Sequence, residues 1–181
     1  MNQLPSAVFL DRDGTIIKDA NYISRPEQVE LIDGAAEAIS RINAALVPVI
    51  VVTNQSGIGR GFYTLADYAR VRERVEELLE QHGARVDATY MCPHKPEDGC
   101  LCRKPGTLLF ERASEDLGID LSSALFIGDR LRDIEPAKKF GARGVLIPAL
   151  ATPPAEIEAA ANTARGADSL STALDWFLCS N

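Results

Sequence analysis

Short apolar segments that end in polar side chains recur along the chain, and they constrain its fold more than any other feature. Three of these junctions lie at residues 7–11, 47–53 and 124–129, where the first polar side chain belongs to Asp, Thr and Asp respectively. Buried strands of a parallel sheet have this nearly continuous apolar pattern, because helices cover both of their faces. The chain is therefore predicted to build a parallel sheet with polar groups at its strand ends.

Segments with helical periodicity separate these apolar segments. We expect helices over residues 35–46, 65–82, 106–117, 134–140, 155–164 and 174–178, and further strands over 86–91 and 144–147. This alternation predicts an α/β fold of the Rossmann-like type, with helices on both faces of a parallel sheet. Residues 16–33 fit neither pattern, and we expect them to form a β-hairpin flap over the edge of the sheet.

The composition suits one domain, which we expect to span residues 1–181. Apolar residues make up 46% and charged residues 25% of the chain, enough for a packed core and a polar surface. The formal charge of −7 argues against nucleic acid or an anionic membrane as the main partner, since both select basic surfaces. No apolar run approaches the roughly 20 residues that span a bilayer, and the first residues lack a secretory signal pattern. We therefore expect a cytoplasmic location, and we separately expect a monomer.

Asp11 and Asp13 follow the first apolar segment in the sequence Asp-Arg-Asp-Gly-Thr. The carboxyl ends of parallel strands meet at one edge of a sheet, so these side chains are expected near Thr53 and Asp129. Two carboxylates two positions apart can act as a nucleophile and a neighbouring acid/base, with Mg²⁺ to neutralise their charge. The alternative interpretation is a turn, in which Asp and Gly are common.

Further polar residues are expected at the same edge. The hydroxyl of Thr53 and the backbone N–H groups that follow it could hold phosphoryl oxygens, although a polar turn without function is the alternative. Asp129 is a third candidate metal ligand, but as a helix N-cap it would need no function, and Asp133 is expected to support or cap this segment. Arg103 and Lys104 offer the positive charge that phosphotransfer requires, unless they form a solvated charge pair.

Cys92, His94, Cys100 and Cys102 form a C-x-H-x5-C-x-C pattern. Three sulfurs and one imidazole saturate a tetrahedral Zn²⁺, which leaves no position for water and predicts a structural site. The crowding of these cysteines differs from a secreted disulfide scaffold, and three free thiols in a proline-rich loop are the alternative. Cys179 lies apart and is expected to be a lone, partly buried thiol.

Together these motifs resemble the haloacid dehalogenase (HAD) superfamily of phosphatases. The Asp-x-Asp-Gly-Thr strand end, the Thr after the second strand, the Lys before a helix and the late Gly-Asp-x-x-x-Asp occur in that family's order. The segments DRDGTI, VVTNQSGIGRG, CPH and CRKP narrow the resemblance to the D-glycero-D-manno-heptose 1,7-bisphosphate phosphatases and the related histidinol-phosphate phosphatases. The resemblance covers residues 7–148 and implies a Mg²⁺-dependent enzyme that acts on a small phosphorylated sugar.

The resemblance also implies roles for individual residues. Asp11 would attack phosphorus to form an aspartyl-phosphate, and Asp13 would act as the acid and base. Mg²⁺ would be held by the Asp11 carboxylate, the Asp13 backbone carbonyl and Asp129. Thr53 and Lys104 would hold the phosphoryl oxygens. The substrate contacts implied by the resemblance are Arg12, Asp19, Ala20, Asn21, Tyr22, Asn54, Gln55, Ser56, Arg103 and Arg130.

The leading hypothesis is hydrolysis of the 7-phosphate of heptose bisphosphate, and a histidinol-phosphate phosphatase of histidine biosynthesis is the alternative. A phosphate-accepting receiver domain is less favoured, because receivers carry their acceptor near the third strand and Asp11 follows the first. An inactive binding module is disfavoured, since every catalytic residue type is present. The chain is too short for a large cap domain, so the flap at 16–33 and the zinc loop are expected to shape an open pocket.

Overall fold

Parallel strands form the centre of the computed structural model, which describes residues 4–161 and 164–178. Within these residues all strands join one sheet in the order β3-β2-β1-β4-β5-β6, and each neighbouring pair is parallel. The strands are β1 (Val8–Leu10), β2 (Val49–Asn54), β3 (Ala88–Cys92), β4 (Leu125–Gly128), β5 (Arg143–Leu146) and β6 (Arg165–Gly166). The predicted α/β fold is confirmed.

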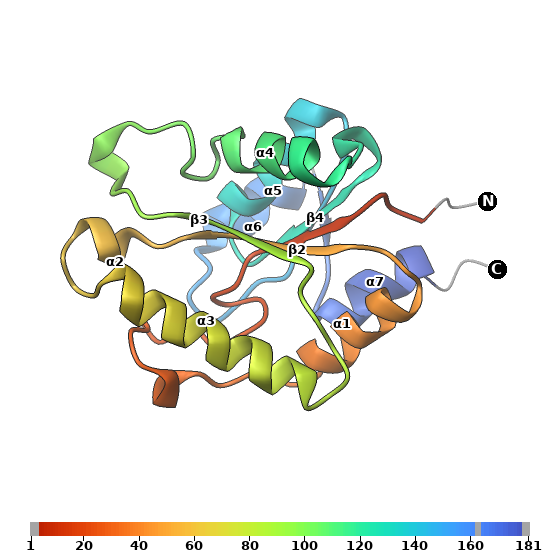
Figure 1. Ribbon diagram of the computed structural model, residues 1–181. Coiled ribbons are helices and arrows are strands. Elements are labelled where there is room, and N and C mark those ends of the chain that lie inside the picture. Colours follow the sequence, from red (N-terminus) through yellow and green to blue (C-terminus); the bar gives the residue numbers. More distant parts are fainter. Residues whose placement is uncertain (1–3, 162–163, 179–181) are drawn as a thin grey trace.

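Helices cover both faces of this sheet, as Figure 1 shows. The α-helices are α1 (Ala35–Ala44), α2 (Ser56–Gly59), α3 (Leu65–Glu80), α4 (Leu108–Leu117), α5 (Leu131–Phe140), α6 (Pro154–Ala161) and α7 (Leu170–Leu178). In Figure 1, α4 and α5 lie above the sheet, while α1, α3 and α7 lie below it. Three 3₁₀ turns, η1 (Pro26–Gln28), η2 (Pro96–Asp98) and η3 (Leu121–Ser123), occur in the connections.

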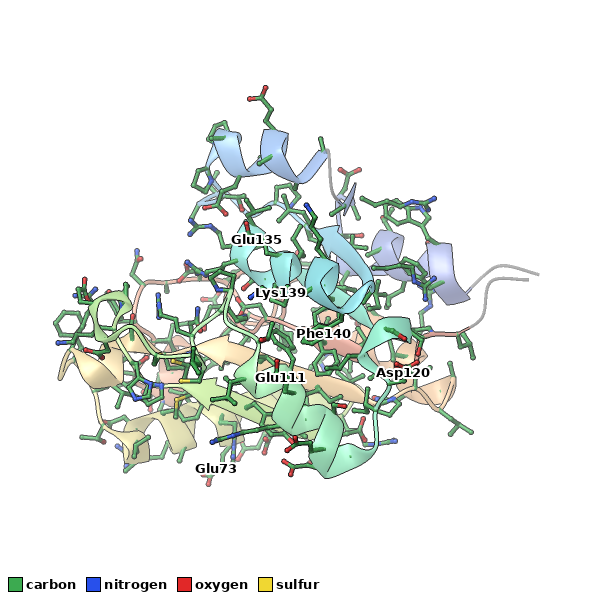
Figure 2. All side chains as sticks on the ribbon, turned by 90° about the horizontal axis from the view of Figure 1, so that it is seen from above. Glu73, Glu111, Asp120, Glu135, Lys139 and Phe140 are labelled. Atoms are coloured by element: carbon green, nitrogen blue, oxygen red, sulfur yellow. The ribbon has the colours of Figure 1, made fainter. Side chains whose placement is uncertain are left out.

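Alternate strand residues supply the two layers of the core, because successive side chains of a strand point to opposite faces. On the α4 face, Phe9 of β1 stacks on Phe126 of β4 at 5.0 Å between ring centroids and meets Phe110 of α4 edge-on at 5.3 Å. Figure 2 looks onto this face and shows Glu111 on α4 and Phe140 on α5. The β1–β4 pair is thus buried on both faces, which fixes the position of the loops at its carboxyl end.

The segment between β1 and α1 differs from the expected hairpin. Ile17 forms single bridges to Asp13 and to Leu31, and no regular two-stranded ladder develops. Pro26 begins η1, and a proline nitrogen has no hydrogen to donate to a ladder. The segment is therefore a compact loop fastened at its base by Ile17.

Two helices begin earlier than their apolar periodicity indicates, because side chains cap them. The backbone N–H of Arg130 donates to Asp133 Oδ2 at 3.0 Å, so α5 starts at Leu131. The hydroxyl of Ser169 accepts from the backbone N–H of Thr172 at 3.1 Å at the start of α7. Capping groups of this kind satisfy N–H groups that have no partner inside the helix.

No helix in the described part of the chain has the length and apolar character needed to cross a membrane. Cys179, expected to be a lone thiol, lies outside the described residues.

Candidate active site

Gly14 allows the loop after β1 to come close to the end of β4. Its φ is +84°, and a Cβ at this position would lie 2.6 Å from Asp129 Oδ2. Only glycine adopts this backbone conformation without strain and leaves room for the approaching carboxylate. The Asp-x-Asp-Gly-Thr loop and Asp129 are therefore placed side by side, as the sheet order requires.

A buried cluster of charged side chains lies at this edge. Lys104 is 3% exposed, and its Nζ lies 2.7 Å from Asp11 Oδ1 and 2.8 Å from Asp133 Oδ1. The same ammonium donates a hydrogen bond to the backbone carbonyl of Val52. Asp11, Asp129 and Asp133 each offer a carboxylate oxygen within 4.8 Å of the others. Asp11 and Asp133 thus share one lysine, and Asp129 adds a third carboxylate beside them, which leaves excess negative charge in a buried region.

The excess charge and burial perturb the carboxyl groups of the cluster. Burial raises the pKa of Asp129 to about 8, with a further contribution from the negative charges of Asp11 and Asp133. Burial also raises the pKa of Asp11 to about 6, although the Lys104 charge acts in the opposite direction. Asp129 Oδ1 is buried without a hydrogen-bond partner. A hard divalent cation with a preference for oxygen ligands, such as Mg²⁺, fits this donor set.

Asp13 is held by a separate hydrogen-bonded network. The guanidinium of Arg12 donates to both Asp13 oxygens, from Nε at 3.1 Å and from Nη2 at 2.9 Å. Gln55 Nε2 donates to Asp13 Oδ2 at 2.9 Å and to Thr53 Oγ1 at 2.8 Å. Because Gln55 donates to it, the Thr53 hydroxyl keeps its own hydrogen for an incoming oxygen. The Asp13 side chain remains 22% exposed, so a substrate can reach it.

Tyr63, which the sequence did not single out, fixes the orientation of the Gln55 amide. Its hydroxyl donates to Gln55 Oε1 at 2.6 Å, and burial raises the Tyr63 pKa to about 12, so the phenol stays protonated. With Oε1 accepting, the Nε2 side of the amide faces Asp13 and Thr53. Arg12 is held from its other side, with its guanidinium 5.5 Å from the centre of the Tyr68 ring.

The four residues of the Cys/His pattern come together after β3, at the neighbouring strand end. Cys102 Sγ lies 3.2 Å from Cys92 Sγ and 3.5 Å from Cys100 Sγ, and His94 Nδ1 lies 3.1 Å from Cys102 Sγ. The cysteines are free thiols. Three sulfurs and one nitrogen at these separations match the donor set of a tetrahedral zinc site.

Asn54 joins this loop to the buried cluster. Its Nδ2 donates to the Lys104 backbone carbonyl at 3.2 Å, and its Oδ1 accepts from the Lys104 backbone N–H at 3.0 Å. The amide is thus used to hold Lys104, a structural task that sequence spacing did not reveal. Arg103 donates to the backbone carbonyl of His94 at 3.3 Å, within the Cys/His loop.

The remaining expected substrate contacts lie outside the buried cluster, on the loops that surround it. Asp19 to Tyr22 are exposed residues of the loop after β1, where Asn21 and Tyr22 have φ values of +51° and +56°. The ring of Tyr22 meets Phe62 edge-on, with centroids 4.8 Å apart. Ser56 begins α2, and Arg130 lies between β4 and α5. The structure thus groups Asp11, Asp13, Thr53, Lys104 and Asp129 closely and leaves Asp19–Tyr22 on an outer segment.

Comparisons with known proteins point to the same chemistry. A family model described as HAD-hydrolase-like matches residues 101–173. The D-glycero-beta-D-manno-heptose-1,7-bisphosphate 7-phosphatase of Pseudomonas aeruginosa is 41% identical over 143 residues, which are 78% of this chain and 80% of that protein. A probable heptose bisphosphate 7-phosphatase of Thermoplasma acidophilum is 40% identical over 129 residues, covering 71% of this chain and 81% of that protein.

A solved structure resembles the whole fold. The D,D-heptose 1,7-bisphosphate phosphatase of B. bronchiseptica, crystallised with magnesium and phosphate, has a TM-score of 0.85 and 29% identity, with 96% of this chain and 98% of that chain covered. The expected resemblance is confirmed by sequence and by structure. The chain therefore belongs to the D-glycero-D-manno-heptose 1,7-bisphosphate 7-phosphatase family of HAD phosphatases, which are phosphoric monoester hydrolases.

Proposed function

We propose that this protein removes the 7-phosphate of D-glycero-D-manno-heptose 1,7-bisphosphate in a Mg²⁺-dependent reaction. The observation that carries the proposal is the buried cluster of Asp11, Asp129 and Asp133, of which Asp11 and Asp133 share Lys104, beside the accessible carboxylate of Asp13. The relatives named above are heptose bisphosphate phosphatases, and the bound magnesium and phosphate of the solved structure support the same chemistry. The histidinol-phosphate alternative is not favoured by these relatives.

The reaction proceeds in two displacements at phosphorus. In the first, a carboxylate oxygen of Asp11 forms a bond to phosphorus as the bond to the sugar oxygen breaks, and Asp13 gives a proton to that leaving oxygen. In the second, Asp13 takes a proton from a water molecule, the water oxygen bonds to phosphorus, and Asp11 is released with inorganic phosphate. The network of Arg12 and Gln55 holds Asp13 in place for both proton transfers.

Thr53 and Lys104 stabilise the transferring group. The Thr53 hydroxyl, whose hydrogen is not used by Gln55, would donate to a phosphoryl oxygen, and the Lys104 ammonium beside Asp11 would supply positive charge to the phosphoryl oxygens, which carry the spread charge of the transition state. Mg²⁺ would be held by Asp11, Asp129 and the backbone carbonyl of Asp13, and when bound it supplies positive charge between the phosphate and these acids. The unpartnered Asp129 Oδ1 supports this assignment.

The substrate's second phosphate and its sugar would be bound at the rim. Arg103 and Arg130 supply cations that can bind a phosphate in a bidentate way. The proposed sugar contacts are Asp19, Ala20, Asn21, Tyr22 and Ser56. Contact of Arg12, Asn54 and Gln55 with the substrate stays a prediction, since Arg12 and Gln55 bind Asp13 and Asn54 binds Lys104.

We further propose that Zn²⁺ is bound by Cys92, His94, Cys100 and Cys102 and that it has a structural role. Four protein ligands saturate the metal and leave no position for a reacting water. The support is the mutual approach of the three sulfurs and one ring nitrogen.

Steady-state kinetics with a panel of phosphate esters in the presence of Mg²⁺ tests the proposed activity. We expect the highest kcat/KM for the heptose 1,7-bisphosphate, with release of one equivalent of phosphate and retention of the 1-phosphate. A higher kcat/KM for histidinol phosphate would move the assignment to the alternative. Loss of activity on chelation, reversed by added Mg²⁺, tests the metal requirement separately.

A further inference from the structure

Glu156, in the first turn of α6, binds the residues that follow Asp129. Arg130 donates to this carboxylate from Nε to Oε2 at 3.0 Å and from Nη2 to Oε1 at 2.5 Å. The backbone N–H of Leu131, the first residue of α5, also donates to Oε2 at 2.8 Å. One carboxylate therefore fixes a guanidinium in a bidentate pair and satisfies an N–H that has no partner inside its helix.

The segment that carries Glu156 is itself anchored at the catalytic edge. Thr152, which is 7% exposed, donates from Oγ1 to the backbone carbonyl of Asp129 at 2.7 Å and accepts from the N–H of Ala149 at 2.9 Å. Ala160 of α6 packs in an apolar cluster with Ile134 of α5 and with Leu146. Residues 149–161 thus bind one group from each of three consecutive residues. These groups are the Asp129 carbonyl, the Arg130 guanidinium and the Leu131 N–H.

Arg130 uses only part of its guanidinium in this pair. The hydrogen bonds and the charge of Glu156 raise the pKa of Arg130, and the charges of Asp129 and Asp133 add to this effect. The Glu156 pair occupies the Nε and Nη2 edge, and no residue in the described ranges forms a hydrogen bond with Nη1. One edge of the guanidinium is therefore left for a ligand.

We propose that Glu156 is a positioning residue for substrate binding: it orients Arg130 so that the Nη1 edge binds the phosphate that is not hydrolysed. The inference rests on the proposed substrate contact of Arg130. It assigns a task to the α6 segment, which carries none of the motifs of the chemical site. The carboxylate itself does not touch the substrate.

The test compares Glu156→Gln with wild type and with Glu158→Gln, an exposed glutamate of the same helix. For the heptose bisphosphate we expect Glu156→Gln to raise KM about tenfold with kcat within about twofold, the size of effect expected from one misaligned charge-assisted contact. Inhibition by inorganic phosphate, which occupies the Asp11 subsite alone, should be unchanged. Glu158→Gln should match wild type in all three quantities.

A double variant shows whether Glu156 acts through Arg130. In an Arg130→Ala background, the Glu156→Gln change should add nothing to KM, because the group it positions is gone. An equal KM increase in both backgrounds would overturn the proposal, as would an unchanged KM in the single variant. A fall in kcat and in phosphate affinity together with a lower Tm would also overturn it, since this result means a structural role.

The same measurements separate this inference from the proposed function. Wild-type protein without turnover of the bisphosphate would overturn both. Turnover by wild type with an unaltered KM in Glu156→Gln would overturn the positioning role alone. Glu156→Asp keeps the charge on a shorter side chain, and a KM between those of wild type and Glu156→Gln would support the role of the charge.

Discussion

Three segments far apart in the sequence supply Asp11, Asp129 and Lys104, whereas one stretch of residues 92–102 supplies the whole Cys/His cluster. The first cluster is assembled by the order of the sheet, in which β1 lies between β2 and β4. The second is assembled by a loop that follows β3. The carboxylate cluster therefore depends on the packing of the core, and the Cys/His cluster depends on local chain geometry and on the zinc proposed for it.

The two clusters also differ in burial and charge. Asp11, Asp129 and Asp133 are each 6% exposed or less, while His94 is exposed and Cys100 and Cys102 are half-buried. Burial, together with the negative charges of Asp11 and Asp133, raises the pKa of Asp129, so this site favours a bound cation. We propose that the buried cluster carries the chemistry and that the loop cluster supports it, and the following variants test this division.

The largest effect is expected for Asp11→Asn, which removes the proposed nucleophile of the buried cluster. We expect kcat to fall at least about 1000-fold and the phosphoenzyme to disappear, because an amide oxygen is a far weaker nucleophile than a carboxylate. The measurements are steady-state kinetics and acid quenching with labelled substrate, with thermal melting to verify folding. Retention of more than about 5% of wild-type kcat would contradict covalent catalysis.

Lys104→Met should damage both stability and activity, because it leaves buried carboxylates without their cation. We expect a loss of about 3–5 kcal/mol in the free energy of unfolding of the metal-free protein. Activity should fall about 100- to 1000-fold through loss of charge stabilisation. Urea unfolding and kinetics check these values against Lys139→Met, an exposed change on α5 (Figure 2). Equal stability of the two variants would refute the importance of the buried pairs.

The raised pKa of Asp129 predicts that Mg²⁺ affinity depends on pH. The folded carboxyl has a pKa of about 8 against 3.8 as the ordinary value, so the metal-free folded protein binds one more proton than the unfolded chain in between. Its stability therefore decreases as pH rises through this window, by up to about 1.4 kcal/mol per pH unit. Mg²⁺ must displace the same proton, so its affinity should rise about tenfold per unit from pH 6 to 8 and then level off.

Calorimetric titration with Mg²⁺ at pH 6, 7, 8 and 9 checks this dependence. Titrations in buffers of different ionisation enthalpy report the proton released on binding. An affinity that is constant over this range would show that Asp129 is already ionised before the metal arrives.

Cys100→Ser should affect binding more than chemistry. The structure anchors Lys104 twice, through Asn54 and through its buried ion pairs, so loss of zinc should loosen Arg103 but leave Lys104 in place. We expect zinc content near zero, KM raised about fivefold and Mg²⁺ affinity unchanged. Metal analysis and kinetics are compared with Cys179→Ser. Absence of zinc from wild-type protein purified without chelator would refute the zinc site.

The smallest effect is expected for Tyr63→Phe, which removes one hydrogen bond to Gln55. The amide is then free to turn away from Asp13, and kcat should fall about fivefold, equivalent to about 1 kcal/mol. Tyr90→Phe is the matched control, since its hydroxyl binds Asp116 on α4 rather than a residue of the site. Equal kcat values in the two variants would mean that Asp13 does not need this support.

The sequence was sufficient to predict those parts of the site that depend on a local residue pattern or on the order of the strands. Apolar segments ending in Asp or Thr predicted which residues meet at one edge, and the C-x-H-x5-C-x-C spacing predicted the loop cluster. The network around Asp13 was not predictable, because Tyr63 lies in a connection without a motif. The ion pair between Arg130 and Glu156 was not predictable for a similar reason. The two residues lie 26 positions apart, and the sequence of α6 is typical of an alanine-rich surface helix.

The start of α5 differed from the start predicted by apolar periodicity, because a capping side chain determines it. Asp133 was expected to support or cap its segment, and it accepts from the N–H of Arg130 while its other oxygen lies near Lys104. A residue with two such tasks cannot be identified from one pattern. The loop after β1 also differed, since isolated bridges of Ile17 took the place of a hairpin.

The pairing of Asn54 with the backbone of Lys104 has a consequence for redesign. Asn54 of β2 binds the backbone of Lys104, and Cys92 belongs to β3, so both ends of the segment from Cys92 to Lys104 are attached to the sheet. This segment is therefore a unit that could be exchanged between related enzymes. We expect substitutions of its exposed side chains to leave Lys104 in place, provided that the four Cys/His positions are kept. In a chimaera with an exchanged segment, we expect Lys104 to stay in place only if Asn54 is kept as well.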